Sequence, residues 1–313
     1  MNNPLLNLCF YSSGLDFDLA KVPAKNLLLL GVKGRSLELE SKFLDFFKIQ
    51  YIKTQLNTNV RNIGIDPKII NCINCNNPII VIVDRYYLDY LKINRNHFGY
   101  HAVIVTGYNL EKGDVVLIDG LTGRKEILSI KNFNQALTKE EPYESEAGTI
   151  YTISNYGSIN ITIQDYMKAL SDQCNYFFAD GGIAFKIKVI INYLQRTSKN
   201  ALQNNEITMF LRVQLALPSS TFREQDVDGS FYRRLYFNYL LSDFNRTSFN
   251  EDDFKYLSNL ADDDIRLWRE IGSNDFADVF QKSEYFIEKL SEILNCETEI
   301  FSILRNVRLD YDK

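Results

Sequence analysis

The fold is decided by residues 96–120, whose sequence is NHFGYHAVIVTGYNLEKGDVVLIDG. Two apolar runs rich in β-branched residues, 102–105 and 115–118, lie on either side of a polar segment that contains Gly113. Runs of this kind are typical of two antiparallel strands joined by a hairpin. Because the strands are apolar, the sequence predicts that this hairpin belongs to a buried sheet.

Both histidines of the chain, His97 and His101, belong to this stretch. His101 comes directly before the first apolar run, and Asp119 directly follows the second. In an ideal hairpin centred on residues 111–112, Asp119 pairs with Ile104, so its contact with His101 would be diagonal. A histidine oriented by a carboxylate is the base half of a nucleophilic triad. The alternative is an ordinary hairpin with a polar residue at a strand end, and the pattern alone does not decide between the two.

Residues 78–88 (PIIVIVDRYYL), 97–108 (HFGYHAVIVTGY) and 115–119 (VVLID) resemble the N-terminal domain of the butirosin biosynthesis protein H family. The resemblance implies a papain-like fold with a cysteine-dependent site, in which His101 would be the base and Asp119 its orienting carboxylate. It also implies transfer of an acyl group from an acyl carrier protein thioester to an amine of an aminoglycoside.

Cys9 is the candidate nucleophile, because it is the only cysteine near the N-terminus. Asn3 lies six residues before it, where papain-like enzymes often keep a glutamine for the oxyanion hole. However, Asn3 and Pro4 also form a helix start, and Gly14 suits a helix stop. Such a helix would place Cys9 in its middle, whereas a thiol is activated at a helix N-terminus. Relatives of the family show a full helix between the nucleophile and a glycine resembling Gly14, so a core position for Cys9 stays open.

Asp84 and Tyr86 follow the apolar run 79–83, which predicts a strand buried on both faces. Together with His97, in the loop before His101, they are the residues that we expect to line the acyl or acceptor pocket. The alternative for this tyrosine-rich segment is a sheet edge packed by aromatic side chains.

The composition is that of a globular protein: of 313 residues, 45% are hydrophobic and 24% are charged. This length is enough for one large or two ordinary domains. A net charge of −5 argues against nucleic-acid binding as the main function. The sequence shows no secretory signal and no apolar run long enough to span a bilayer, so it predicts a cytoplasmic protein without a membrane partner.

Five cysteines, an odd number in a chain of this length, predict reduced thiols and not a disulfide framework. Cys72 and Cys75 form a lone C-x-x-C pair, whereas zinc requires a second pair of ligands. The pair lies before a strand and not at the start of a helix, where redox pairs lie. The sequence therefore predicts neither a metal nor a cofactor of its own. The resemblance implies 4′-phosphopantetheine only as the group carried by a partner protein.

From about residue 158 the apolar period changes from two to roughly 3.6. Helices are predicted at 163–175, 182–194, 206–216, 229–245, 252–271 and 276–294, with a loop at 218–228. The segment 229–236 (GSFYRRLY) resembles the family's helical C-terminal region. The predicted fold class is α+β, with a papain-like domain at 1–157 whose sheet is mostly antiparallel, and an all-helical domain at 158–313.

Arg233 and Arg234 are adjacent in one of these predicted helices. A guanidinium group matches phosphate geometry, so this pair could face the phosphate of a phosphopantetheine. The commoner arrangement is a salt bridge, and we favour one with an acid from residues 262–264.

The resemblance as a whole implies a cysteine acyltransferase of secondary metabolism, such as antibiotic biosynthesis. Cys9 would attack the carrier-bound thioester, His101 would shuttle the proton, and an amine would resolve the acyl-enzyme. The expected partners are an acyl carrier protein or peptidyl carrier domain and a small-molecule amine acceptor. Two alternatives stay open: a cysteine peptidase or thioesterase, and an inactive relative that binds a carrier protein or a metabolite.

Overall fold

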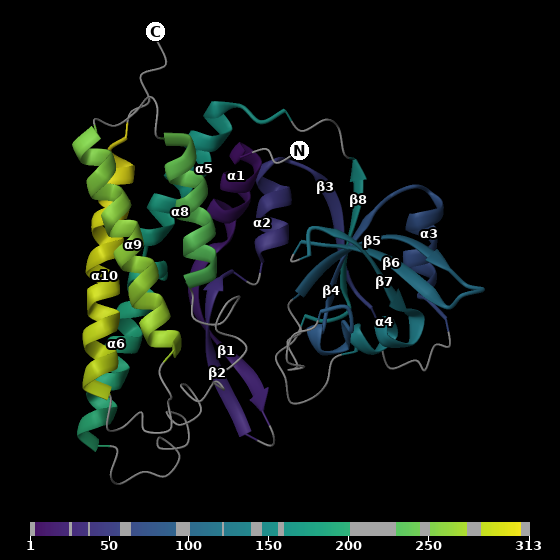
Figure 1. Ribbon diagram of the computed structural model, residues 1–313, viewed down its shortest axis with the longest axis horizontal. Coiled ribbons are helices and arrows are strands. Elements are labelled where there is room, and N and C mark those ends of the chain that lie inside the picture. Colours follow the sequence, from purple (N-terminus) through teal and green to yellow (C-terminus); the bar gives the residue numbers. More distant parts are fainter. Residues whose placement is uncertain are drawn as a thin grey trace. The chain divides into compact units, whose positions relative to one another are not determined.

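The computed structural model describes residues 4–24, 27–36, 38–56, 64–91, 101–120, 122–138, 146–155, 160–200, 230–244, 251–273 and 283–307. These residues form two compact units, which are described separately. The sheet unit comprises the described parts of Lys21–Leu28 and Leu44–Ile159. The helical unit comprises those of Met1–Ala20, Leu29–Phe43 and Asn160–Lys313. The predicted α+β class, with an antiparallel sheet followed by a helical C-terminal region, is confirmed (Figure 1).

The sheet unit is built on one sheet, which has six strands among the described residues. In spatial order these are β3 (Gln50–Gln55), β8 (Thr149–Asn155), β4 (Ile79–Val83), β5 (His101–Asn109), β6 (Asp114–Asp119) and β7 (Arg124–Ser129). Each strand is antiparallel to its neighbours. The hairpin predicted from the sequence is β5–β6, and its turn contains Gly113 at a φ of 71°, which glycine adopts without strain.

One face of the sheet forms the core of this unit. The strands contribute alternate apolar side chains to it, and two helices, α3 (Pro67–Asn74) and α4 (Ile130–Ala136), cover it with Ile69, Phe133 and Ala136. Each large apolar side chain buried in this way stabilises the fold by about 1.5–3 kcal/mol relative to exposure. The period of two in the strand sequences thus sets which residues face the helices.

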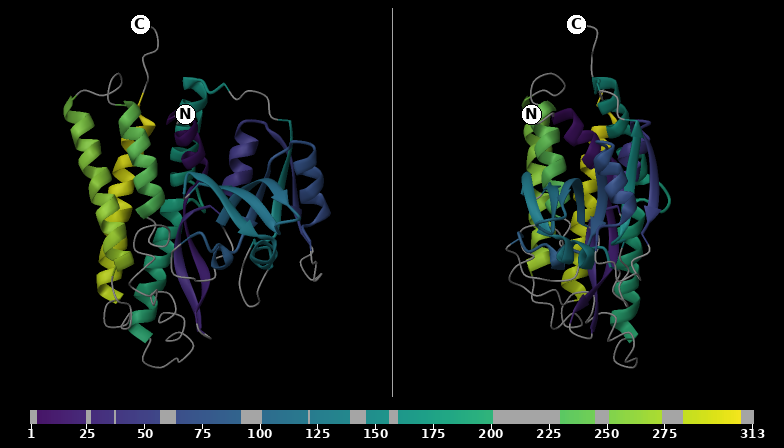
Figure 2. Two further views of the ribbon diagram at one scale, coloured as in Figure 1. Left: turned by 45° about the vertical axis from the view of Figure 1, so that its right-hand side comes forward. Right: turned by 90° about the vertical axis from the view of Figure 1, so that its right-hand side faces the viewer.

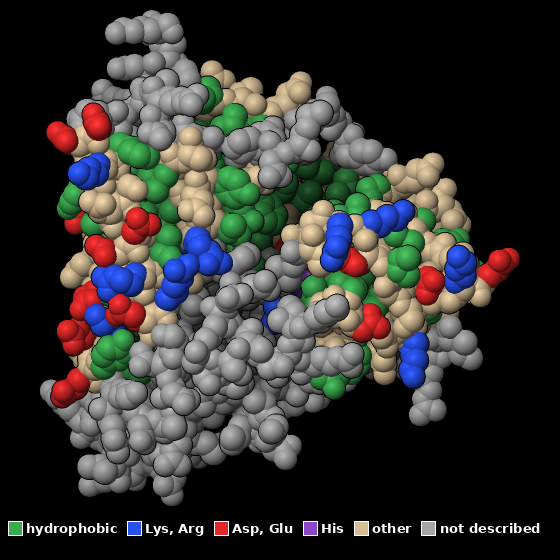
Figure 3. All heavy atoms as spheres, viewed as in Figure 1, with side chains coloured by type: hydrophobic (Ala, Val, Ile, Leu, Met, Phe, Trp, Pro, Cys, Tyr) green, Lys and Arg blue, Asp and Glu red, His purple; other side chains and the backbone are tan. Residues whose placement is uncertain are grey.

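Among the described residues, the helical unit has helices at five of the six positions predicted in the C-terminal region, and the last of them ends at Arg305 and not at residue 294. They are α5 (Ile163–Phe178), α6 (Ile183–Asn200), α8 (Ser230–Phe244), α9 (Glu251–Ser273) and α10 (Ser283–Arg305). α10 packs against α5, α6 and α9, and Figure 2 shows these helices running side by side. Figure 3 shows acidic and basic side chains mixed along the outer surface of α9 and α10. The helix predicted at 206–216 and the loop at 218–228 lie outside the described residues.

The N-terminal part of the chain forms a helix, α1 (Pro4–Gly14), followed by a hairpin of β1 (Leu15–Ala24) and β2 (Leu27–Arg35) and by α2 (Leu39–Phe46). Of these elements, residues 21–24, 27–28 and 44–46 belong to the sheet unit and the rest to the helical unit. α1 packs against α5 and α8. The C-terminal part of the unit begins at Asn160, next to the boundary expected at residue 158. The N-terminal segments of the helical unit, Met1–Ala20 and Leu29–Phe43, come from the region that we expected to belong to the first domain.

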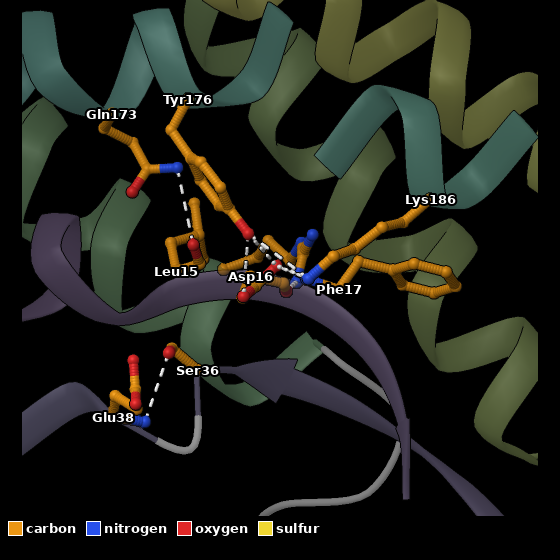
Figure 4. Close-up of polar contacts among 9 residues, drawn as sticks. Leu15, Asp16, Phe17, Ser36, Glu38, Gln173, Tyr176 and Lys186 are labelled. Atoms are coloured by element: carbon orange, nitrogen blue, oxygen red, sulfur yellow. Dashed lines mark hydrogen bonds and ion pairs between the residues drawn. The ribbon is translucent and has the colours of Figure 1, made fainter. Parts of the chain in front are cut away.

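A partly buried polar cluster fixes the start of β1 to α5 and α6 (Figure 4). The carboxylate of Asp16 accepts hydrogen bonds from the ammonium of Lys186 at 3.0 Å and from the hydroxyl of Tyr176 at 3.0 Å. The same ammonium donates to the Tyr176 hydroxyl at 3.2 Å. Burial first, and then the charge of Asp16, raises the pKa of Tyr176. The phenol therefore stays protonated. The cluster has a structural role, because its hydrogen bonds join β1 to α5 and α6.

A buried ion pair lies in the middle of the helical unit. Arg233 on α8 donates from Nε to Glu297 on α10 at 2.7 Å, and both side chains are at most 1% exposed. Trp268 on α9 donates from its indole nitrogen to the same oxygen of Glu297 at 3.0 Å, and the guanidinium lies 4.6 Å from the centre of its ring. An ion pair with an acid from residues 262–264 was predicted for one arginine of this helix; the charge of Arg233 acts on Asp264, and the acid that it is hydrogen-bonded to is Glu297. The acid is 64 residues away in the sequence, so no local pattern identifies it.

Candidate functional site

His101 and Asp119 lie at one end of the sheet. His101 is the first residue of β5 and pairs with Val83, the last residue of β4. Asp119 is the last residue of β6. The ends of three neighbouring strands therefore meet at this point, and they bring two polar side chains to the edge of an apolar core.

The register of the hairpin differs from the ideal one by a single residue. Asp119 pairs with Val103 and not with Ile104, because the register shifts between Val105 and Gly107 and leaves Thr106 without a pairing partner in the described sheet. An extra residue of this kind is a β-bulge. Directly paired residues share a face of the sheet, and so do residues two apart on one strand. The bulge therefore places Asp119 on the face of His101, whereas the ideal register would have placed it on the opposite face.

The two side chains are in direct contact. Nε2 of His101 lies 2.8 Å from Oδ2 of Asp119. The aspartate side chain is fully buried and the histidine side chain is 12% exposed. Because Asp119 holds Nε2, Nδ1 is the ring nitrogen that remains to exchange a proton with a nucleophile or a substrate.

A tyrosine completes this arrangement. The hydroxyl of Tyr90 donates to the same oxygen, Oδ2 of Asp119, at 2.8 Å. Burial first, and then the charge of Asp119, raises the pKa of Tyr90 well above its usual range, so the hydroxyl stays protonated. The sequence analysis did not single out Tyr90 as part of this site. The two residues are 29 positions apart, and nothing in the sequence relates them.

Of the three residues predicted to line a pocket, Asp84 and Tyr86 can be described. Asp84 is buried, and its side chain caps a short 3-10 helix, η1 (Arg85–Tyr87), by accepting a hydrogen bond from the backbone N–H of Tyr86 at 2.9 Å. The ring of Tyr86 packs edge-on against Tyr87, with the ring centres 5.0 Å apart. These contacts correspond to the packed sheet edge of the alternative interpretation. A contact with substrate stays a prediction, and His97 lies outside the described residues.

Cys9 lies in the middle of α1, in the helical unit. Its side chain is fully buried, and burial first, and then the charge of Asp165, raises the pKa of the thiol to about 12. A thiol of this kind is almost entirely protonated at neutral pH. The mid-helix position, which was one of the two open placements, is the one observed.

Two further properties bear on the kind of site. Among the described residues, there is no group of three or more histidine, cysteine, aspartate or glutamate side chains that could hold a metal ion. None of the described helices combines the length and the apolar character that crossing a membrane requires.

Comparison with known protein families identifies the N-terminal part of the chain. Residues 6–120 match the model of the family described as butirosin biosynthesis protein H, N-terminal. The matched stretch contains both members of the His101–Asp119 pair as well as Tyr90 and Cys9. A comparison with curated proteins found no match.

Proposed function

Because residues 6–120 match the model of the family described as butirosin biosynthesis protein H, N-terminal, we propose that this protein transfers an acyl group from a carrier-protein thioester to an amine. The acceptor would be a small molecule of secondary metabolism, in the manner of antibiotic biosynthesis, and the donor an acyl carrier protein or a peptidyl carrier domain. The observation that supports this proposal is the His101–Asp119 pair, whose partners are 2.8 Å apart at the end of the sheet.

In this proposal His101 is the general base. Nδ1 takes the proton of the nucleophilic thiol, the thiolate attacks the carbonyl carbon of the thioester, and the carrier's thiol leaves with that proton. The amine then attacks the acyl-enzyme, loses a proton to Nδ1, and the enzyme's thiol is restored. Asp119 stabilises the imidazolium that forms in each half-reaction. Cys9 is the thiol that the sequence indicates for this role, and Asp84, Tyr86 and His97 would contact the substrates.

The burial of Cys9 favours a second candidate function. A protonated, fully buried thiol is a poor nucleophile, and such a protein could bind a carrier protein or a metabolite without forming an acyl-enzyme. The two candidates differ in whether a covalent intermediate appears.

Intact-mass measurement separates the candidates. The protein is incubated with an acyl-pantetheine thioester, and Cys9→Ser, His101→Ala and Cys174→Ser are compared with the wild type. Cys174 is the matched control, because its thiol is also fully buried and burial likewise raises its pKa to about 12. The proposal expects an acyl adduct that disappears in Cys9→Ser, persists in Cys174→Ser and forms slowly in His101→Ala.

The remaining outcomes decide between the alternatives. Saturable binding of the thioester without any adduct or turnover supports the binding function and contradicts the transferase. An adduct that is released by water as readily as by an amine identifies a thioesterase. An adduct that persists in Cys9→Ser excludes Cys9 as the nucleophile.

A further inference from the structure

One oxygen of Asp119 is held from two sides. Oδ2 lies 2.8 Å from Nε2 of His101 and accepts a hydrogen bond from the hydroxyl of Tyr90, also at 2.8 Å. The aspartate side chain is fully buried, so water does not reach it from the surface. Two donors on one oxygen determine both where the carboxylate points and which nitrogen of the imidazole it holds.

We propose that Tyr90 is a positioning residue of the His101–Asp119 pair, which keeps Oδ2 directed at Nε2 and thereby keeps Nδ1 available for proton transfer. The catalytic meaning of this inference depends on the proposed function. The positioning itself is a property of the folded protein and can be measured without activity.

The segment that carries Tyr90 is held in place by contacts at Asp84 and at Asp89. At its start, the side chain of Asp84 caps η1, and the backbone N–H of Asp84 donates to the carbonyl of Ala136 at the end of α4 at 2.7 Å. Before Tyr90, the carboxylate of Asp89 accepts a hydrogen bond from the side chain of Asn132 on α4 at 2.9 Å. Between them, Leu88 is buried in the core. The hydroxyl therefore reaches Asp119 from a segment that directly follows β4 and is anchored to α4.

Tyr90 can act on Asp119 only as a donor. Besides burial, the charges that raise its pKa are acidic: Asp119 first, then Glu126 on β7 and Asp89, and together they keep the phenol protonated. Glu126 itself is paired with Arg124 at 3.0 Å. Hydrogen bonds from two donors stabilise the ionised form of a carboxylate, which is the form that orients an imidazole.

The experiment replaces Tyr90 with phenylalanine and uses Tyr108→Phe as the matched control. Tyr108 lies on β5, and its hydroxyl donates to Asn74 at 2.9 Å, away from Asp119. Both variants lose one hydroxyl of the same sheet unit, so a difference between them reports the contact with Asp119. The spectra of ¹⁵N-histidine-labelled protein are simple, because the chain has two histidines and His101→Ala assigns them.

In the wild type and in Tyr108→Phe we expect a slowly exchanging Nε2 proton on His101 and an unprotonated Nδ1. In Tyr90→Phe we expect this proton to exchange faster and the two tautomers to become mixed. Turnover should fall by about tenfold in kcat with KM unchanged, the factor of one charge-assisted hydrogen bond. The acidic limb of the pH–rate profile should also move, which loss of packing alone would not cause.

Spectra and turnover of Tyr90→Phe that match those of Tyr108→Phe would overturn the inference. Should Tyr90→Phe fail to fold, the wild type provides a second measurement. A protected Tyr90 hydroxyl proton with a nuclear Overhauser effect to the Nε2 proton supports the inference, and its absence contradicts it. If no protein variant shows acyl transfer but the histidine spectrum responds to Tyr90→Phe, the proposed function fails and the positioning stands.

Discussion

Asp119 and Asp264 are fully buried aspartates, one in each unit, and their surroundings are opposite. Asp119 has two donors on one oxygen, and one of them, His101, is partly exposed. Neither oxygen of Asp264 has a hydrogen-bond partner of good geometry among the described residues, and the acid Glu297 lies near it together with Arg233 and Trp268. Burial first, and then the charge of Glu297, raises the pKa of Asp264 well above its usual value, and these effects outweigh the lowering by Arg233 and Trp268.

The difference shows what distinguishes the candidate site from the core of the helical unit. A buried acid takes up a proton where burial and an acidic neighbour outweigh the groups that stabilise its charge. An acid with donors can stay ionised and can orient the group that donates to it. Burial of a carboxylate is therefore weak evidence of function, whereas donors together with a partly exposed base are stronger evidence.

The largest expected effect comes from removing the base beside Asp119. His101→Ala should reduce acyl transfer by about 10²–10⁴-fold, because the proton acceptor is lost. His97→Ala should retain most of the activity. Separate rate measurements on the two variants test this expectation, and loss in His97→Ala alone would assign the base to His97.

On the helical side, Arg233→Met should lower the free energy of unfolding by about 3–5 kcal/mol, because Glu297 is left as a buried acid without its cation. The control is Arg266→Met, which removes an exposed arginine paired with Asp263 and Glu270 on the same helix. That variant should change stability by about 1 kcal/mol or less. Urea unfolding measures both, and equal losses would contradict the buried pair as the cause.

Asp264 gives a pH dependence whose sign can be worked out. In the unfolded chain its carboxyl ionises near pH 4, roughly the value of a model peptide. The folded protein keeps the proton to higher pH, so unfolding releases a proton and becomes more favourable as the pH rises above this value. Asp264→Asn should therefore lose less stability between pH 5 and pH 8 than the wild type, whereas the exposed Asp263→Asn should follow the wild type. Parallel urea titrations at the two pH values decide this, and identical slopes in all three would contradict a neutral Asp264.

The smallest effect concerns the thiols. Cys9 is fully buried, so Cys9→Ala should cost roughly 1 kcal/mol of stability, as small core truncations do. In the native protein, iodoacetamide should modify the exposed Cys75 first and Cys9 slowly. Peptide mapping after timed labelling shows the order. Rapid modification of Cys9 would contradict its place in the core and favour the acyl-enzyme mechanism.

Much of the fold follows from local sequence. The apolar run at 79–83 is a strand with the same bounds, and the predicted hairpin is β5–β6. The strand β1 was not predicted, although Leu15 and Phe17 alternate with acidic residues in the way a strand requires. The other features that were not predicted do not follow from local sequence. The register of the hairpin depends on a bulge, and the contacts of Tyr90 and Arg233 join distant segments. A sequence pattern specifies which residues are buried more readily than which distant partner they meet.

The bulge at Thr106 makes the candidate site depend on how β5 and β6 are paired as well as on the identity of their residues. Without the bulge, the unchanged chain would pair Asp119 with Ile104 and turn it to the face opposite His101. Deleting Thr106 would remove the bulge and still leave Val103 opposite Asp119, so the pair would be kept. When related sequences are aligned, a one-residue gap at Thr106 is therefore compatible with the His101–Asp119 pair.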